Sequence, residues 1–131
     1  MMPFVLSRLL LRRPRAARVT AACAVALTFS STVFAHALPT TREPAPNTEV
    51  SAPAQVTIHF SEPLEPAFSK ITLTDAQGRA AASGAAQVDP QDKASMRLAL
   101  QPLAPGRYTV HWIAVASDGH RTHGDYAFTV K

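Results

Sequence analysis

The chain has 131 residues, of which 47% are hydrophobic and 17% charged, and its formal net charge is +4 at neutral pH. Five of the 13 Lys and Arg residues lie in the first 35 positions, so the remainder carries 8 basic against 9 acidic side chains, a formal charge of −1. The positive charge therefore gives no indication of a nucleic-acid-binding surface. The single cysteine, Cys23, also lies in the first segment, which excludes a disulfide framework and a thiolate metal site from the remainder.

Residues 1–35 follow the order of a secretory signal peptide. Arginines precede an uncharged apolar run, and the segment ends in Val33-Phe34-Ala35, which suits a signal peptidase. Cleavage after Ala35 would make His36 the new N-terminus, whereas cleavage after Ala37 is the main competitor. A single membrane anchor is the alternative, but the uncharged stretch is short for a span. We expect residues 1–35 to be removed on export and residues 36–131 to form one soluble domain.

The remaining chain is predicted to consist of short β-strands. Apolar and polar residues alternate in five segments, at 55–60, 70–74, 96–100, 106–112 and 126–130. Turn residues separate these segments, and nine prolines argue against a long helix. The pattern is typical of an all-β sandwich or barrel of about seven strands. We also expect a helical turn around 65–69 and a mobile hairpin or loop over 76–94.

Two Asp and two His residues fall within positions 118–125. Asp118 and His120 have i, i+2 spacing, which on an extended segment directs both side chains to the same side. The pair is a weak metal signal by itself, because Asp-Gly also forms ordinary tight turns. His123 and Asp125 repeat the spacing, and we expect them on the polar face of the last strand, with His123 as an accessory ligand candidate.

Histidine at position 36 strengthens the metal hypothesis. An N-terminal His offers its α-amine and its ring Nδ1 together, and both can close a chelate ring on one metal ion. With Asp118 and His120 the set becomes three nitrogens and one oxygen, the tetragonal N,O coordination that Cu(II) prefers. Glu62, which follows a predicted strand, is a further accessory candidate. The residues therefore predict one Cu(II) ion per mature chain.

The other histidines and the tryptophan are assigned to structural positions. His59 and His111 alternate with core residues, so we expect them on the outer faces of their strands. Trp112 shares a face with Tyr108 and Val110 and is expected in the core.

The mature chain resembles the CopC family of periplasmic copper-binding proteins over nearly all of residues 36–131. The resemblance rests on these stretches: His36-Ala37, the Pro-Ala-Pro-Asn segment at 44–47, the V-T-I-H-F-S-E-P-L segment at 56–64, the L-A-P-G-R-Y-T-V segment at 103–110 with Trp112, and V-A-S-D-G-H at 115–120. It implies an Ig-like barrel or sandwich with cupredoxin-like Greek-key topology. It also implies a Cu(II) site at His36, Asp118 and His120, with Glu62 nearby.

The chain differs from some relatives in its methionines. Those relatives carry a Met-rich loop for Cu(I), whereas Met96 is the only methionine within residues 36–131. Since thioether ligands suit Cu(I), we predict no Cu(I) methionine site. Arg121-Thr122-His123 also replaces the more usual Pro-containing continuation after the D-x-H motif.

Three classes of function are compatible with these residues. We expect a Cu(II)-binding protein for copper resistance, homeostasis or delivery to an inner-membrane importer of the CopD type, and not an enzyme. A terminal-His copper oxidative enzyme is an alternative, but the chain shows no flat aromatic surface for a glycan. A metal-free β-sandwich interaction module is another. A blue-copper electron carrier is excluded, because its site needs a Cys thiolate.

Overall fold

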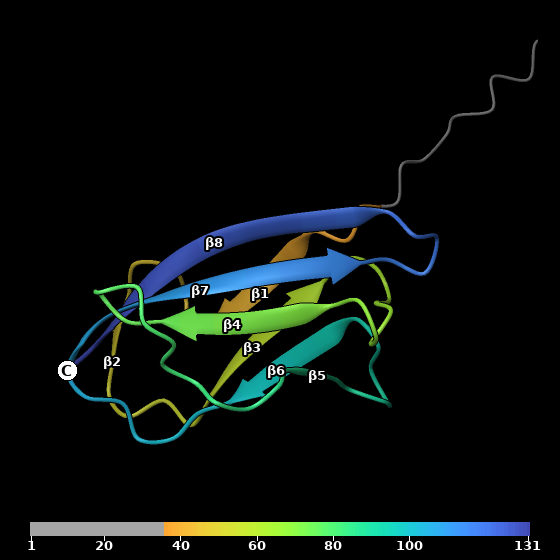
Figure 1. Ribbon diagram of the computed structural model, residues 1–131. Helices are drawn as coiled ribbons and strands as arrows, with labels where there is room; N and C mark the ends of the chain where they lie inside the picture. Colours follow the sequence, from red (N-terminus) through yellow and green to blue (C-terminus); the bar gives the residue numbers. More distant parts are fainter. Residues whose placement is uncertain (1–35) are drawn as a thin grey trace, which may run out of the picture. The chain divides into compact units, whose positions relative to one another are not determined.

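The computed structural model describes residues 36–131, and the expected signal peptide lies outside the described residues. Two four-stranded sheets form the fold, with strand orders β1-β3-β6-β5 and β2-β8-β7-β4 (Figure 1). The strands are β1 (Pro39–Glu43), β2 (Glu49–Val50), β3 (Gln55–Phe60), β4 (Lys70–Thr74), β5 (Gln87–Val88), β6 (Ser95–Ala99), β7 (Gly106–Val115) and β8 (Arg121–Val130). No helix within residues 36–131 is long and apolar enough to cross a membrane.

The core lies between the two sheets and is built from the alternating residues of the longer strands. Its largest fully buried side chains are Phe60, Phe128, Ile58, Leu64, Ile71, Leu73, Met96, Leu98, Val56 and Val110. Phe60 of β3 meets Trp112 of β7 across the sandwich, edge to face, with ring centroids 5.5 Å apart. The predicted all-β sandwich is confirmed, and Trp112 occupies the expected core position.

Two features of the strand prediction are wrong in detail. The structure has eight strands between residues 36 and 131, and alternation missed β1, β2 and the two-residue β5, which lies inside the segment 76–94. β1 is an edge strand whose residues are exposed or half-buried, so it has no apolar face to detect, and β2 has only two residues. β8 begins at Arg121, five residues before the predicted segment at 126–130.

The long β7–β8 hairpin positions the candidate site. Its ten residue pairs run from Gly106 opposite Val130 to Val115 opposite Arg121. Along β8, exposed positions alternate with half-buried ones from residue 121 to 126. His123 and Asp125 therefore lie on the outer face of the sheet, as expected for strand residues.

Gly124 occupies a position of the β7–β8 hairpin where no side chain fits. It lies opposite Trp112, and a Cβ atom built there would come within 2.7 Å of the indole Cζ2. The indole thus occupies the space that any other residue would need.

We expect Gly124→Ala to lower the free energy of unfolding by about 1–3 kcal/mol, the usual cost of forcing an extra carbon into a packed core. Urea unfolding followed by circular dichroism measures it. Gly84→Ala is the matched control, because nothing lies within 4 Å of its added Cβ and its φ is not positive. Equal stabilities of the two variants would contradict the clash.

Candidate metal centre

The connection between β7 and β8 is a tight turn that carries Asp118 and His120. The Ala116 N–H donates to the His120 carbonyl at 2.9 Å, and the Gly119 N–H donates to the Ala116 carbonyl at 2.8 Å. Gly119 has a φ of +87°, a left-handed conformation that glycine adopts without a Cβ penalty. The Asp-Gly dipeptide is therefore needed for the turn as well as for the spacing.

Asp118 and His120 converge, but for a different reason from the one predicted. The segment is a turn, not an extended strand, and Asp118 folds back over it. Its Oδ1 accepts the His120 backbone N–H at 3.0 Å, and its Oδ2 lies 2.9 Å from His120 Nδ1. The two side chains meet because Asp stabilises turns through such bonds to its own backbone. About half of each side chain is exposed, at 41% for Asp118 and 48% for His120.

Three residues at the start of the described chain are held beside this turn. The His36 carbonyl accepts a hydrogen bond from Ser61 Oγ at 3.0 Å, and the Ala37 carbonyl accepts one from Thr122 Oγ1 at 2.6 Å. Leu38 and Ser61 exchange two further bonds, through the Leu38 N–H to Ser61 Oγ and the Ser61 N–H to the Leu38 carbonyl. Ala37 is fully buried in the core. Residues from both sheets thus fix the backbone of this segment.

This anchoring brings His36 to His120 although 84 positions separate them. The two imidazole rings lie with their centroids 5.5 Å apart and their planes inclined by 50°. Since Ser61 follows β3 and Thr122 belongs to β8, the pair forms where the two sheets meet at one end of the sandwich. His36 and the D-x-H motif, which the sequence analysis grouped into one site, therefore lie close together.

The electrostatics of the turn keep the carboxylate ionised. The pKa of Asp118 is lowered, first by the hydrogen bond from the His120 backbone N–H and then by the contact with the His120 side chain. A carboxylate that is already ionised has no proton to lose when it binds a cation, so proton competition for a metal would fall on the nitrogen donors.

One pair of the predicted donors has the spacing of neighbouring ligands on a tetragonal cation. Two donors at right angles around a metal, each with a bond of about 2.0–2.1 Å, stand about 2.8–3.0 Å apart. Asp118 Oδ2 and His120 Nδ1 are 2.9 Å apart. Among the described residues, no three His, Cys, Asp or Glu side chains form a metal-holding group. A fourth donor in the predicted set is the main-chain nitrogen of His36, and this nitrogen becomes an amine only after cleavage.

The two accessory ligand candidates, Glu62 and His123, lie in different parts of the structure. Glu62 directly follows Ser61, which bonds to the backbone of His36, and it is half-buried there. His123 lies on the outer face of β8, whereas its neighbour Thr122 points to the other side and bonds to Ala37. The structure therefore does not bring His123 to the His36–His120 pair, because adjacent strand residues face opposite ways.

The other histidines have structural partners. His111 Nδ1 lies 2.6 Å from Asp125 Oδ1, and its Nε2 lies 2.9 Å from Thr74 Oγ1, so both ring nitrogens are engaged. His59 Nε2 lies 3.0 Å from Asp92 Oδ2. Both histidines are half-buried on strand faces away from the core, as predicted.

Ser61 and Thr122 are the residues that the sequence reasoning missed. Both are small hydroxyl residues beside a candidate ligand motif, Ser61 before Glu62 and Thr122 after Arg121. Such residues are common on β-strands and their ends, so composition alone carried no signal that they hold the backbone of residues 36–38.

Comparison with known proteins identifies relatives of the whole described domain. The family model described as the CopC domain matches residues 39–131. The chain is 40% identical to Protein YobA of Escherichia coli (strain K12) over 101 residues, which are 76% of this chain and 82% of that protein.

Two solved structures share the fold. CopC from Methylosinus trichosporium OB3b aligns with a TM-score of 0.69 and 31% identity, covering 73% of this chain and 94% of that one. PcoC, a methionine-rich copper resistance protein from Escherichia coli, aligns with a TM-score of 0.61 and 38% identity, covering 74% of this chain and all of that one.

Proposed function

Because the chain belongs to the CopC family, we propose that its exported form is a periplasmic protein that binds one Cu(II) ion between His36 and the turn carrying Asp118 and His120. Copper binding in a resistance or transport role is the function of the family. The observation that carries the proposal is the 5.5 Å approach of the His36 and His120 rings, which the backbone bonds of Ser61 and Thr122 maintain.

Signal cleavage after Ala35 is part of this proposal. While residue 35 is attached, the nitrogen of His36 is an amide and is a poor metal donor. Cleavage converts it into an amine beside the His36 ring, and both can then bind one ion. The site would therefore be completed on export, which confines tight Cu(II) binding to the periplasm.

Asp118 supplies the oxygen donor in the proposed set, and His120 supplies the third nitrogen. Their facing atoms, Oδ2 and Nδ1, already lie at the spacing of neighbouring ligands. The carboxylate lowers the charge of the bound Cu(II), which favours the oxidised ion over Cu(I). Met96, the one methionine within residues 36–131, is fully buried in the core, so the proposed copper chemistry is that of Cu(II) alone.

Delivery to an inner-membrane importer of the CopD type is the proposed use of the bound ion. The site is built from half-exposed side chains at the end of the sandwich, so a partner can reach the metal without opening the core. A binding protein is favoured over a copper oxidative enzyme, because Trp112 and Tyr108 are buried and offer no aromatic platform for a polysaccharide.

We expect His120→Ala to weaken Cu(II) binding by about 100-fold or more, since losing even a supporting residue of a metal site costs about 10–100-fold. Competitive titration of the exported protein measures the affinity, and its EPR spectrum should be tetragonal and rich in nitrogen ligands. His59→Ala is the matched control, because His59 is engaged with Asp92 on an outer strand face. A wild-type protein that binds no Cu(II), or equal affinities of the two variants, would sink the proposal.

A further inference from the structure

The outer face of the β4–β7–β8 sheet has an unusual composition near the turn. Lys70, Ile113 and His123 lie in one row across the three strands, because Ile113 is paired with both of the others. In the next row, Val115 is paired with Arg121. Cross-strand neighbours of this kind are about 4.5–5.5 Å apart. Ile113 is thus flanked by Lys70 and His123, and Val115 by Arg121; we call this surface, together with Phe68, the basic face.

Phe68 adds an aromatic side chain to the basic face. It is 68% exposed, the most exposed large apolar side chain of residues 36–131. The turn at 65–69 positions it, with the Ser69 N–H donating to the Glu65 carbonyl at 3.1 Å. The Glu65 N–H in turn donates to the Val115 carbonyl at 2.7 Å, which ties the turn to β7. This exposed ring is therefore held on the sheet, not on a free loop.

The cations of the basic face are not neutralised by their neighbours. Within residues 36–131, Lys70 and Arg121 form no ion pair, whereas Arg79, Arg97 and Lys131 each pair with an acidic residue. Asp125, on the same face, contacts His111, and Asp118 contacts His120. The domain is slightly acidic overall, but no acidic residue of the described chain lines the surface between Phe68, Lys70 and Arg121.

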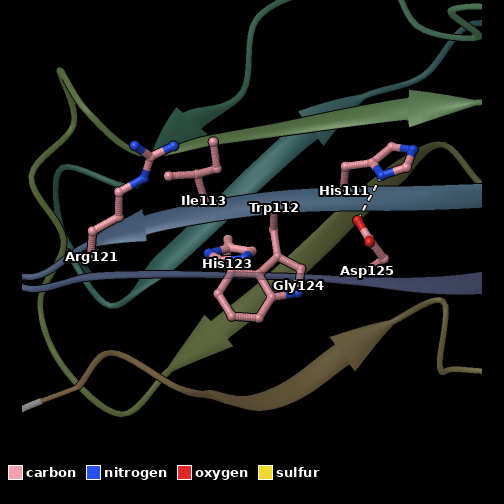
Figure 2. A pocket seen from close by; sticks show the side chains of 7 residues that line it. All are labelled: His111, Trp112, Ile113, Arg121, His123, Gly124 and Asp125. Carbon is pink, nitrogen blue, oxygen red and sulfur yellow. Dashed lines mark hydrogen bonds and ion pairs between the residues drawn. The ribbon is translucent and has the colours of Figure 1, made fainter.

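The basic face is also hollowed. One hollow of about 620 Å³ is lined by Arg121, His123, Ile113 and the His111–Asp125 pair, and Figure 2 shows the first three at one end and the pair at the other. A second hollow of about 510 Å³ is lined by Phe68, Lys70, Ile113, Val115, Gly119 and Arg121. The two hollows share Ile113 and Arg121, so they are adjacent, and we call them together the groove.

We propose that the basic face is a docking groove for an acidic protein segment that carries an apolar side chain. Ile113, Val115 and Phe68 would contact the apolar residue, and Lys70 and Arg121 would attract the acidic ones, as complementary charges do at interfaces. A protein segment fits this surface better than an anionic membrane does, because the apolar and cationic side chains line hollows that a flat bilayer does not fill.

The groove ends at the candidate copper site. Gly119, which lies between Asp118 and His120, lines the second hollow. A docked acidic segment would thus lie beside the proposed ligands, where it could receive the ion. This last step rests on the proposed function, whereas docking itself does not require copper.

The test is an NMR titration of the copper-free exported protein with a capped peptide that has a central Leu flanked by Asp and Glu. We expect saturable shifts of the amides of Phe68, Lys70, Ile113 and Arg121. The combined Lys70→Glu and Arg121→Glu variant should bind at least about 10-fold more weakly, because it reverses the charges that attract the peptide. Arg107→Glu is the matched control, since Arg107 lies on the same face of β7 at the opposite end of the strand.

Several outcomes would overturn the docking proposal. These are no shifts, shifts scattered over the domain, equal binding of a peptide with Lys in place of each acid, or unchanged binding by the charge-reversed variant. Binding to phosphatidylglycerol vesicles without binding to the acidic peptide would assign the face to a membrane instead. Copper titration of the charge-reversed variant separates the two proposals: its Cu(II) affinity should stay within about 3-fold of wild type. Absence of Cu(II) binding by the wild type would contradict the proposed function alone.

Discussion

Adding one residue before His36 of the exported protein is expected to weaken Cu(II) binding by about 100-fold or more, equivalent to about 2.7 kcal/mol. The added peptide bond converts the His36 amine into an amide and breaks the proposed chelate ring. Side chains are unchanged, so the effect isolates the main-chain donor. Because an amine must lose a proton to bind, and its unperturbed pKa is near 8, the wild-type affinity should also fall with decreasing pH.

The controls distinguish lost ligation from lost folding. The extended protein should unfold at the same temperature as the wild type without copper, because the bonds from Ser61 and Thr122 go to carbonyl oxygens of His36 and Ala37 that the extension leaves in place. Adding one residue after Lys131 should leave the affinity unchanged. Equal Cu(II) affinities of the protein with and without the N-terminal residue would exclude the amine from the site and leave only the side chains.

Mass spectrometry of the exported protein is the companion measurement. A first residue at His36 is required by the proposed site, whereas a first residue at Leu38 would remove both His36 and Ala37. A start at Leu38 would also remove two of the hydrogen bonds that anchor residues 36–38, those from Ser61 and Thr122.

Phe60→Ala is expected to lower the free energy of unfolding by about 3–5 kcal/mol, the usual cost of removing a buried aromatic ring. Phe60 is 1% exposed and its ring contacts Trp112 of the opposite sheet. Loss of the ring leaves a cavity between the sheets close to Ser61, which holds His36. The melting temperature of a domain of this size should fall by roughly 12 °C or more.

Phe68→Ala is the matched control for this substitution. The same side chain is removed, but Phe68 is 68% exposed, so the stability should change by no more than about 0.5 kcal/mol. The two variants also separate stability from docking, since Phe68 belongs to the basic face and Phe60 does not. A Phe60→Ala protein as stable as the Phe68→Ala protein would contradict the placement of the core.

Much of the fold was predictable because alternation reports burial on one face of a strand. The segments at 55–60, 70–74 and 106–112 lie within strands β3, β4 and β7, and their apolar residues line the core. β1 was missed because neither of its faces is fully buried. The end of the last connection was misplaced because polar residues 121–125 look like a loop, although each pairs with a residue of β7.

The sequence by itself determined the chemical types of the candidate donors, the absence of cysteine after residue 35 and the conditional role of His36 at a new N-terminus. These depend on residue identity and on cleavage, which are local properties of the chain. Only the tertiary structure decided that His36 meets His120 and that β8 begins as early as Arg121. The first depends on bonds from Ser61 and Thr122 across 25 and 85 positions of sequence, and the second depends on pairing with β7. Contacts over such separations are specified by packing of the two sheets, which no local pattern encodes.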